Sequence, residues 1–240
     1  MEISEKAFTE IYSLSRTGGL LQGLVHNLNA PLQNLGMDMD MIALTLEQKK
    51  EPDPGLIQEL KKRLSRMEEE FDKLNRLIRL TASRSEPEQD PLPVAALRDF
   101  LEDELEFLRA NLYFKHYVET SLELNEPLTG TVSLPKGTCS ALGGLLHALV
   151  DEMEKLCMQK LIVQTKAGAA LELSIEVREA ALPKGFISAL ELSARPGDNP
   201  PPLDKSNTAA IHAGLLLKAA GIALEARSDH CLRLNIPCQS

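Results

Sequence analysis

The sequence predicts an α+β protein in which an N-terminal helical hairpin is followed by a mixed domain of helices and strands. Two observations lead to this prediction. Apolar residues recur at alternating spacings of three and four through most of residues 1–84, and after residue 93 helix-like and strand-like segments are interspersed. With 240 residues the chain is long enough for two modest domains. We therefore expect a hairpin domain at 1–84, a linker at 85–93 and a second domain at 94–240.

The hairpin is predicted from two heptad-like seams on either side of the segment 51–55, whose two prolines and glycine predict a break. A two-helix hairpin leaves apolar surface uncovered on both of its helices. We therefore expect a homodimer in which two hairpins form a four-helix bundle. The seam residues are Leu21, Leu24, Leu28, Leu32, Leu35, Met39, Ile42 and Leu46, followed by Ile57, Leu60, Leu64, Met67, Phe71, Leu74 and Ile78.

The second domain is predicted to be an α/β sandwich that combines helices with a largely antiparallel sheet. The segment 195–204 holds four prolines and predicts a loop. The expected helices cover 94–116, 139–158 and 209–220, and the expected strands cover 118–124, 161–165, 171–177, 187–192, 222–226 and 232–236.

Composition and charge exclude several classes of protein. Acidic side chains outnumber basic ones by 35 to 26, which gives a formal charge of −9 and argues against nucleic-acid binding. No apolar run reaches the length of a membrane span, and the first residues do not resemble a signal peptide. The four cysteines form no metal-binding spacing and indicate reduced thiols. We expect a cytoplasmic protein that binds neither membrane nor nucleic acid.

His26 is the candidate for chemistry, because helical periodicity turns it about 200° from Leu24 and therefore toward solvent. A neutral imidazole can accept and release a phosphoryl group through a covalent intermediate. The alternative interpretation is an ordinary surface histidine, which is the usual outcome for a histidine taken alone. The neighbours expected on this face are Gly19, Gln22, Gly23, Asn29 and Ala30.

Two further features of this helix are unusual for a helical pattern. A glycine inside a helix costs about 1 kcal/mol relative to alanine, so Gly19 and Gly23 predict a close approach of another molecule to the backbone. Pro31 predicts a kink about one turn after His26.

The segment His26–Leu32 reads His-Asn-Leu-Asn-Ala-Pro-Leu and resembles the phosphoacceptor box of bacterial sensor histidine kinases. In that family the box lies on a helical hairpin that dimerises. The resemblance continues into the second domain: 92–124 is similar to the entry helix and first strand of the family's ATP-binding domain, 142–156 to the helix that carries its nucleotide-site asparagine, and 209–236 to its closing helix and strands. The resemblance implies a phosphoaccepting His26 and an ATPase-like second domain.

The sequence departs from the family wherever the nucleotide would bind. Glu152, or Asp151, stands where the resemblance places the asparagine, and a carboxylate there would repel a triphosphate. The segment 178–183 has no Asp-x-Gly-x-Gly turn, and 206–210 has no glycine-rich segment to hold phosphates. We therefore expect no ATP binding and no bound cofactor, with Mg²⁺ present only on a partner receiver domain.

Two departures lie in the box itself. The residue after the histidine is usually an acid in the kinases and acts as a base, whereas Asn27 cannot accept a proton. The fourth residue after the histidine positions water in family members with phosphatase activity, and Ala30 cannot do so. The departures favour simple transfer to and from an aspartate over attack on ATP or hydrolysis.

The resemblance and its departures together favour a dimeric histidine phosphotransferase. We expect His26 to relay a phosphoryl group between the aspartates of response-regulator receiver domains, which would dock near Gly19, Gly23 and Ala30. One alternative is a catalytically silent pseudokinase that serves as a dimeric docking module. A less favoured alternative is an active histidine kinase with Glu152 as a nucleotide-site ligand.

Other polar residues have simpler interpretations. The remaining histidines have no metal-binding spacing, so we expect no metal site. The alternation 37–41 predicts core methionines with solvated carboxylates, and 68–70 predicts a solvated face. The remaining histidines are His116, His147, His212 and His230.

Overall fold

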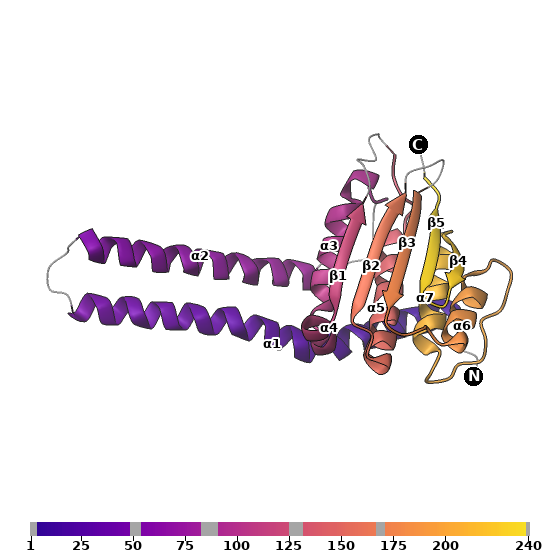
Figure 1. Ribbon diagram of the computed structural model, residues 1–240, viewed down its shortest axis with the longest axis horizontal. Coiled ribbons are helices and arrows are strands. Elements are labelled where there is room, and N and C mark those ends of the chain that lie inside the picture. Colours follow the sequence, from indigo (N-terminus) through magenta and orange to yellow (C-terminus); the bar gives the residue numbers. More distant parts are fainter. Residues whose placement is uncertain (1–3, 49–53, 83–90, 125–131, 167–170, 239–240) are drawn as a thin grey trace. The chain divides into compact units, whose positions relative to one another are not determined.

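The computed structural model describes residues 4–48, 54–82, 91–124, 132–166 and 171–238 (Figure 1). By its internal contacts the chain divides into two compact units. One unit is Leu20–Pro87, and the other joins Met1–Gly19 to Glu88–Ser240. The predicted α+β class is confirmed, since a long helical hairpin precedes a mixed five-stranded sheet with helices.

The hairpin is formed by α1 (Glu5–Gln48) and α2 (Pro54–Ala82). The predicted break at 51–55 included two residues too many at its end, because α2 begins at Pro54. Proline is well tolerated at the first helical position, where its missing N–H has no helical partner. The rest of that break, residues 49–53, lies outside the described residues. Helix α1 continues through Pro31.

An ion-pair cluster crosses the hairpin where the sequence predicted a different arrangement. Asp38 is buried, and its Oδ1 accepts a hydrogen bond of 3.2 Å from Nη1 of Arg63. Its Oδ2 lies 3.6 Å from Nη2 of Arg66. The expectation for 37–41 was therefore wrong, since Asp38 lies inside while Met37 and Met39 are exposed. Two arginines on the facing helix compensate the charge of this buried carboxylate, whereas the seam predicted from the sequence placed Met39 inside and Asp38 in solvent.

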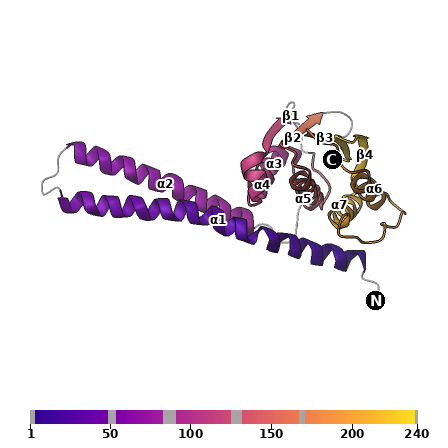
Figure 2. The ribbon, with the colours of Figure 1, turned by 60° about the horizontal axis from the view of Figure 1, so that its bottom comes forward.

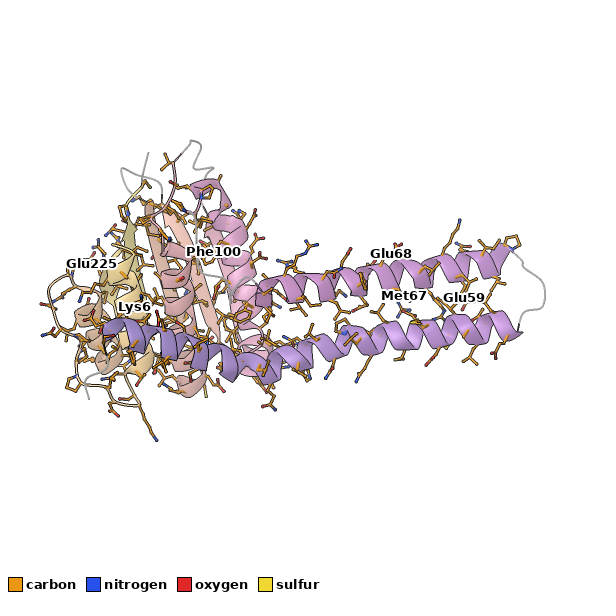
Figure 3. All side chains as sticks on the ribbon, turned by 180° about the vertical axis from the view of Figure 1, so that it is seen from behind. Lys6, Glu59, Met67, Glu68, Phe100 and Glu225 are labelled. Atoms are coloured by element: carbon orange, nitrogen blue, oxygen red, sulfur yellow. The ribbon has the colours of Figure 1, made fainter. Side chains whose placement is uncertain are left out.

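Each hairpin helix also carries an outer row of apolar residues. These side chains recur every seven residues and are between 48% and 59% exposed. The inner positions are more covered: Leu74 is buried, and Met67 is half-buried and points toward α1, whereas Glu68 points away (Figure 3). The outer rows are Val25, Leu32, Met39 and Leu46 on α1, and Ile57, Leu64, Phe71 and Ile78 on α2.

The second unit contains a sheet in the order β1-β2-β3-β5-β4, in which β1 and β2 are parallel and the other pairs are antiparallel. The helix α5 makes the crossover between the two parallel strands, as parallel pairing requires. The strands are β1 (Glu119–Leu124), β2 (Lys160–Lys166), β3 (Leu171–Arg178), β4 (Ala223–Ser228) and β5 (Cys231–Ile236). The helices are η1 (Val94–Ala96), α3 (Leu97–Leu108), α4 (Leu112–Tyr117), α5 (Thr138–Leu156), α6 (Lys184–Ala194) and α7 (Thr208–Ala219).

Helices cover one face of this sheet (Figure 2). Strand β3 shows why, because its buried residues Leu171, Leu173, Ile175 and Val177 alternate with half-buried polar ones. The buried face packs against α5, which is buried along most of its length, from Ala141 to Val150. The result is a two-layer α/β arrangement with one aliphatic core.

The sequence interpretation of 187–192 as a strand was wrong, since these residues belong to α6. The segment does alternate over a few residues, but its buried side chains Phe186, Ala189, Leu190 and Ser193 follow the helical spacing of three, four and seven. The predicted loop after it is confirmed, because α6 ends at Ala194 and α7 begins at Thr208.

The first turns of α1 belong to the second unit through contacts with α7. Oγ of Ser13 lies 3.0 Å from Nε2 of the buried His212. The ring of Tyr12 lies 4.7 Å from that imidazole, and the ring of Phe8 lies 5.9 Å from Tyr12. Glu5 pairs with Lys218 at 3.5 Å. An aromatic cluster thus attaches the start of α1 to α7.

Candidate functional site

His26 lies on α1 with an exposed side chain. Leu24, two residues earlier, is buried. A step of two residues turns the helix by about 200°, so a seam that buries Leu24 turns His26 outward. The ring is therefore accessible from solvent, as the periodicity predicted.

The neighbours of His26 on this face are small or carry amides. Gln22 and Asn29 are exposed at positions i−4 and i+3, and Gly19 and Ala30 are also exposed. Residues three and four apart are surface neighbours on a helix. A Cβ built at Gly19 would meet no heavy atom of the described residues within 4 Å beyond the backbone of its own helix, so packing within the described parts of the chain does not require a glycine there. Asn27 is half-buried beside the seam.

Gly23 differs from the expectation, because it is buried rather than exposed. It lies about 60° around the axis from His26 but only about 40° from the half-buried Asn27. This position is the margin of the buried face, where adjacent side chains cover a residue without a side chain of its own. Gly23 therefore offers little surface for a docking partner.

In the second unit, the carboxylates assigned to the nucleotide-site helix are engaged within the protein. Glu152 on α5 is buried and forms an ion pair with Lys155 one turn later. Asp151 is half-buried, with Oδ2 3.5 Å from Nδ1 of His147. Both contacts run along α5 itself.

The turn after β3 has a structural role in this protein. Glu179 has φ of 85°, which is unusual for a residue with a side chain. Its Oε2 accepts a 2.7 Å hydrogen bond from the backbone N–H of Gln159, just before β2. The turn is therefore bound to the neighbouring strand by a carboxylate.

Helices α6 and α7 approach each other closely at Gly214. A Cβ at this position would lie 2.6 Å from the carbonyl oxygen of Leu190 and 2.6 Å from Cβ of Ser193. Both helices carry buried residues, among them Leu190 on α6 and Ala210 and Leu217 on α7. The glycine inside α7 thus permits helix packing.

The pKa values of a tyrosine phenol and a lysine ammonium group are raised by their surroundings. Burial raises the pKa of the Tyr113 phenol, whose hydroxyl donates a 2.8 Å hydrogen bond to the carbonyl of Met158. The hydrogen bond from Lys73 to Glu70, at 2.8 Å, raises the pKa of that ammonium group. Neither group lies on the helix of His26.

The other histidines differ in burial. His147 and His212 are buried, whereas His116 and His230 are exposed. Within the described ranges, no three His, Cys, Asp or Glu side chains are grouped to hold a metal ion. No helix in the described parts of the chain is long and apolar enough to cross a membrane.

Sequence reasoning missed the contact between His212 and the start of α1, which joins residues 199 positions apart. One signal was available. Phe8 and Tyr12 are two of only nine aromatic residues in the chain, and they stand four residues apart on one helical face.

No protein-family model and no curated protein matches the chain. Among solved structures it is similar to a bacterial phosphotransferase, with 16% identity and a TM-score of 0.42 over 92% of this chain and 95% of that one. It is similar to the mycobacterial sensor histidine kinase MprB, with 15% identity and a TM-score of 0.42 over 62% and 99%. A histidine kinase domain from the Erythrobacter litoralis blue-light activated kinase EL346 has 12% identity and a TM-score of 0.42 over 93% and 94%.

Proposed function

We propose that the chain is a dimeric histidine phosphotransferase whose phosphoacceptor is His26. The observation that carries the proposal is an exposed imidazole on a helical hairpin, within the segment His26–Leu32 that resembles a phosphoacceptor box. The proposed relay takes a phosphoryl group from one receiver-domain aspartate and passes it to another.

The chemistry needs only an accessible ring nitrogen. A neutral nitrogen of His26 attacks the phosphorus of the aspartyl phosphate, the N–P bond forms, and the aspartate leaves as a carboxylate. The reverse step returns the phosphoryl group to a second carboxylate and leaves the imidazole neutral again. Mg²⁺ held by the receiver would neutralise charge on the transferring group.

The residues beside His26 favour transfer over other reactions. The amide of Asn27 cannot act as the base that attack on ATP would use, and the methyl group of Ala30 cannot orient water. At these two positions the segment offers neither a base for attack on ATP nor a group that orients water, which supports transfer through His26.

Dimerisation is part of the proposal and rests on the outer rows of α1 and α2. Rows of half-exposed apolar residues at a strict spacing of seven are typical of helices that pack against further helices. Two hairpins would bury these rows in a four-helix bundle. Val25 precedes His26 by one residue, which places the imidazole about 100° from the proposed interface.

In this proposal the second unit acts without nucleotide, as a scaffold or a docking surface. Glu152 is buried and paired with Lys155, and Gly214 lies against α6. These groups serve internal packing. Receivers would approach the exposed face of α1 at Gly19 and Ala30.

The test is incubation with a panel of receiver domains that carry aspartyl phosphate and have been freed of the small-molecule donor. We expect an acid-labile, base-stable label on the wild-type chain and none on His26→Ala. His230→Ala, which removes another exposed histidine, is the matched control and should keep the label. Equal labelling of His26→Ala, or no label from any receiver, would reject the phosphotransferase in favour of a silent docking module. Saturable ATP binding that stabilises the fold would favour the kinase.

A further inference from the structure

The connection between α6 and α7 contains the only run of three prolines in the sequence. It covers 195–207, and the structure assigns it neither helix nor strand (Figure 1). Four of the chain's 14 prolines lie in it, and its segment 199–203 reads Asn-Pro-Pro-Pro-Leu. A run of this kind restricts the backbone far more than a connection between two helices requires.

Steric restriction gives the segment 199–203 an extended backbone. The pyrrolidine ring holds φ of each proline at about −65°, and a residue that precedes a proline is pushed from the helical region to extended conformations. Asn199, Pro200 and Pro201 each precede a proline, so their backbone resembles a polyproline II helix. This conformation is therefore set by the chain itself, before any partner binds.

Two polar side chains at the start of α7 hold the C-terminal end of the segment. Nδ2 of Asn207 donates a 3.2 Å hydrogen bond to the carbonyl of Pro202, and its Oδ1 accepts one of 2.8 Å from the backbone N–H of Asp204. Oγ1 of Thr208 donates a 2.6 Å hydrogen bond to the carbonyl of Asp204. A regular helix thus fixes the position of the last proline.

A lysine holds the other end of the segment. Nζ of Lys218 donates a 3.2 Å hydrogen bond to the carbonyl of Asp198, which directly precedes Asn199. Lys218 stands in the last turn of α7, so both ends of the segment are bound to the same helix. A binding segment whose conformation is already restricted loses less conformational entropy when it meets a partner.

The segment also presents apolar surface to solvent. Leu203 is 57% exposed, and Pro202 beside it is exposed as well, whereas Pro200 and Pro201 are half-buried. A leucine that leaves more than half of its surface in water contributes little apolar burial to the fold. A polar residue at position 203 would give the connection the same rigidity, so rigidity alone does not account for Leu203.

We propose that the segment 199–203 is a docking element for a partner protein whose groove is lined by aromatic side chains. Such grooves recognise the polyproline II conformation, because flat aromatic rings pack against proline rings and Tyr or Trp groups donate hydrogen bonds to the backbone carbonyls. Leu203 adds an apolar side chain for a pocket beside the groove. The inference goes beyond phosphotransfer and does not depend on His26.

Isolated domains that recognise polyproline II helices are the probes for this segment. The chain has no tryptophan, so the emission of groove tryptophans in an SH3, a WW and an EVH1 domain reports binding without a background signal. We expect the emission of at least one of these domains to change saturably as the full-length chain is added. The proline-rich peptide that the same domain normally binds should reverse the change.

Two variants separate the conformation of the segment from its side chains. Pro201→Gly frees the backbone, and Leu203→Ser removes the exposed apolar side chain. We expect each to raise the dissociation constant by about fivefold or more, from lost preorganisation in the first and lost apolar contact in the second. The matched controls are Pro196→Ala, at an exposed proline of the same connection, and Leu192→Ser, at an exposed leucine of α6, and both should leave binding unchanged.

Three results would overturn the docking element. The first is the absence of a saturable change with all three domains. The second is binding that Pro201→Gly and Leu203→Ser leave unchanged, because the domain would then contact another part of the chain. The third is an equal loss in the control variants, which would indicate association with apolar surface in general. Circular dichroism of each variant confirms that it is folded.

Discussion

Asp38 of α1 and Arg63 of α2 are joined by a 3.2 Å hydrogen bond across the hairpin, with the carboxylate almost entirely buried. The pair fixes which level of one helix faces which level of the other. The apolar seams alone specify register less strongly, because leucine-rich heptads can slide by a repeat. The level of His26 along α2 therefore depends on this contact.

Removing the carboxylate should destabilise the hairpin. Asp38→Ala leaves Arg63 partly buried without its partner, and we expect a loss of about 3 kcal/mol in the free energy of unfolding. Asp40→Ala is the matched control, since Asp40 is exposed two residues away, and it should change stability by less than about 0.5 kcal/mol. Urea unfolding followed by circular dichroism measures the free energy of unfolding of both variants. Equal losses in the two variants would show that the Asp38–Arg63 pair does not stabilise the hairpin.

The outer row of α1 should control self-association. Leu32→Lys places a charge in the proposed interface of both copies, and we expect the dimer dissociation constant to rise at least tenfold, because more than about 1.4 kcal/mol of apolar burial is lost. Leu44→Lys changes a residue that is similarly exposed but turned about 160° from Leu46, and it should leave the dimer intact. Analytical ultracentrifugation distinguishes these results. A monomeric wild type would contradict the bundle.

Gly214 should tolerate no side chain. Gly214→Ala places a Cβ 2.6 Å from the backbone of α6, and we expect a loss of about 1–3 kcal/mol in stability. Gly36→Ala is the control, because a Cβ there would meet no heavy atom of the described residues within 4 Å beyond the backbone of its own helix, and alanine favours the helix by about 0.5–1 kcal/mol. We expect the two substitutions to shift the melting temperature in opposite directions. An unchanged melting temperature for Gly214→Ala would contradict this expectation, because it would mean that α6 and α7 can move apart at little cost in free energy.

His212 should hold the first turns of α1 in place. The chain has no tryptophan, so Tyr12→Trp provides a single fluorophore in the cluster. Adding His212→Ala should shift its emission to longer wavelength and speed hydrogen exchange in residues 5–15, since about 1–2 kcal/mol of local contact is lost. His230→Ala should leave both signals unchanged. Unaltered hydrogen exchange in the His212→Ala variant would show that other contacts hold these turns in place.

Much of the architecture follows from periodicity, because burying one face of a helix or strand leaves a pattern in the sequence. The heptad spacing gave both hairpin helices, and the exposure of His26 followed from its angle to Leu24. Alternation predicted five strands correctly but misassigned 187–192, where a short helix happens to alternate.

The features that could not be predicted depend on contacts between distant residues. Asp38 is buried because two arginines on another helix meet it, and no local pattern signals that pairing. The contact of His212 with Ser13 and the burial of Gly23 depend on tertiary neighbours in the same way. Periodicity indicates which face of a helix or strand a residue occupies, but not which residues from elsewhere in the chain cover that face.

The most direct test of the account is a relay between two receiver domains. One receiver carries radiolabelled aspartyl phosphate, the second is unlabelled, and the chain is added in catalytic amount. We predict that label passes to the second receiver only when the chain has an intact His26, with a transient label on that histidine. Transfer that proceeds equally with His26→Ala, or no transfer although both receivers exchange phosphate with other phosphohistidine proteins, would contradict the central claim.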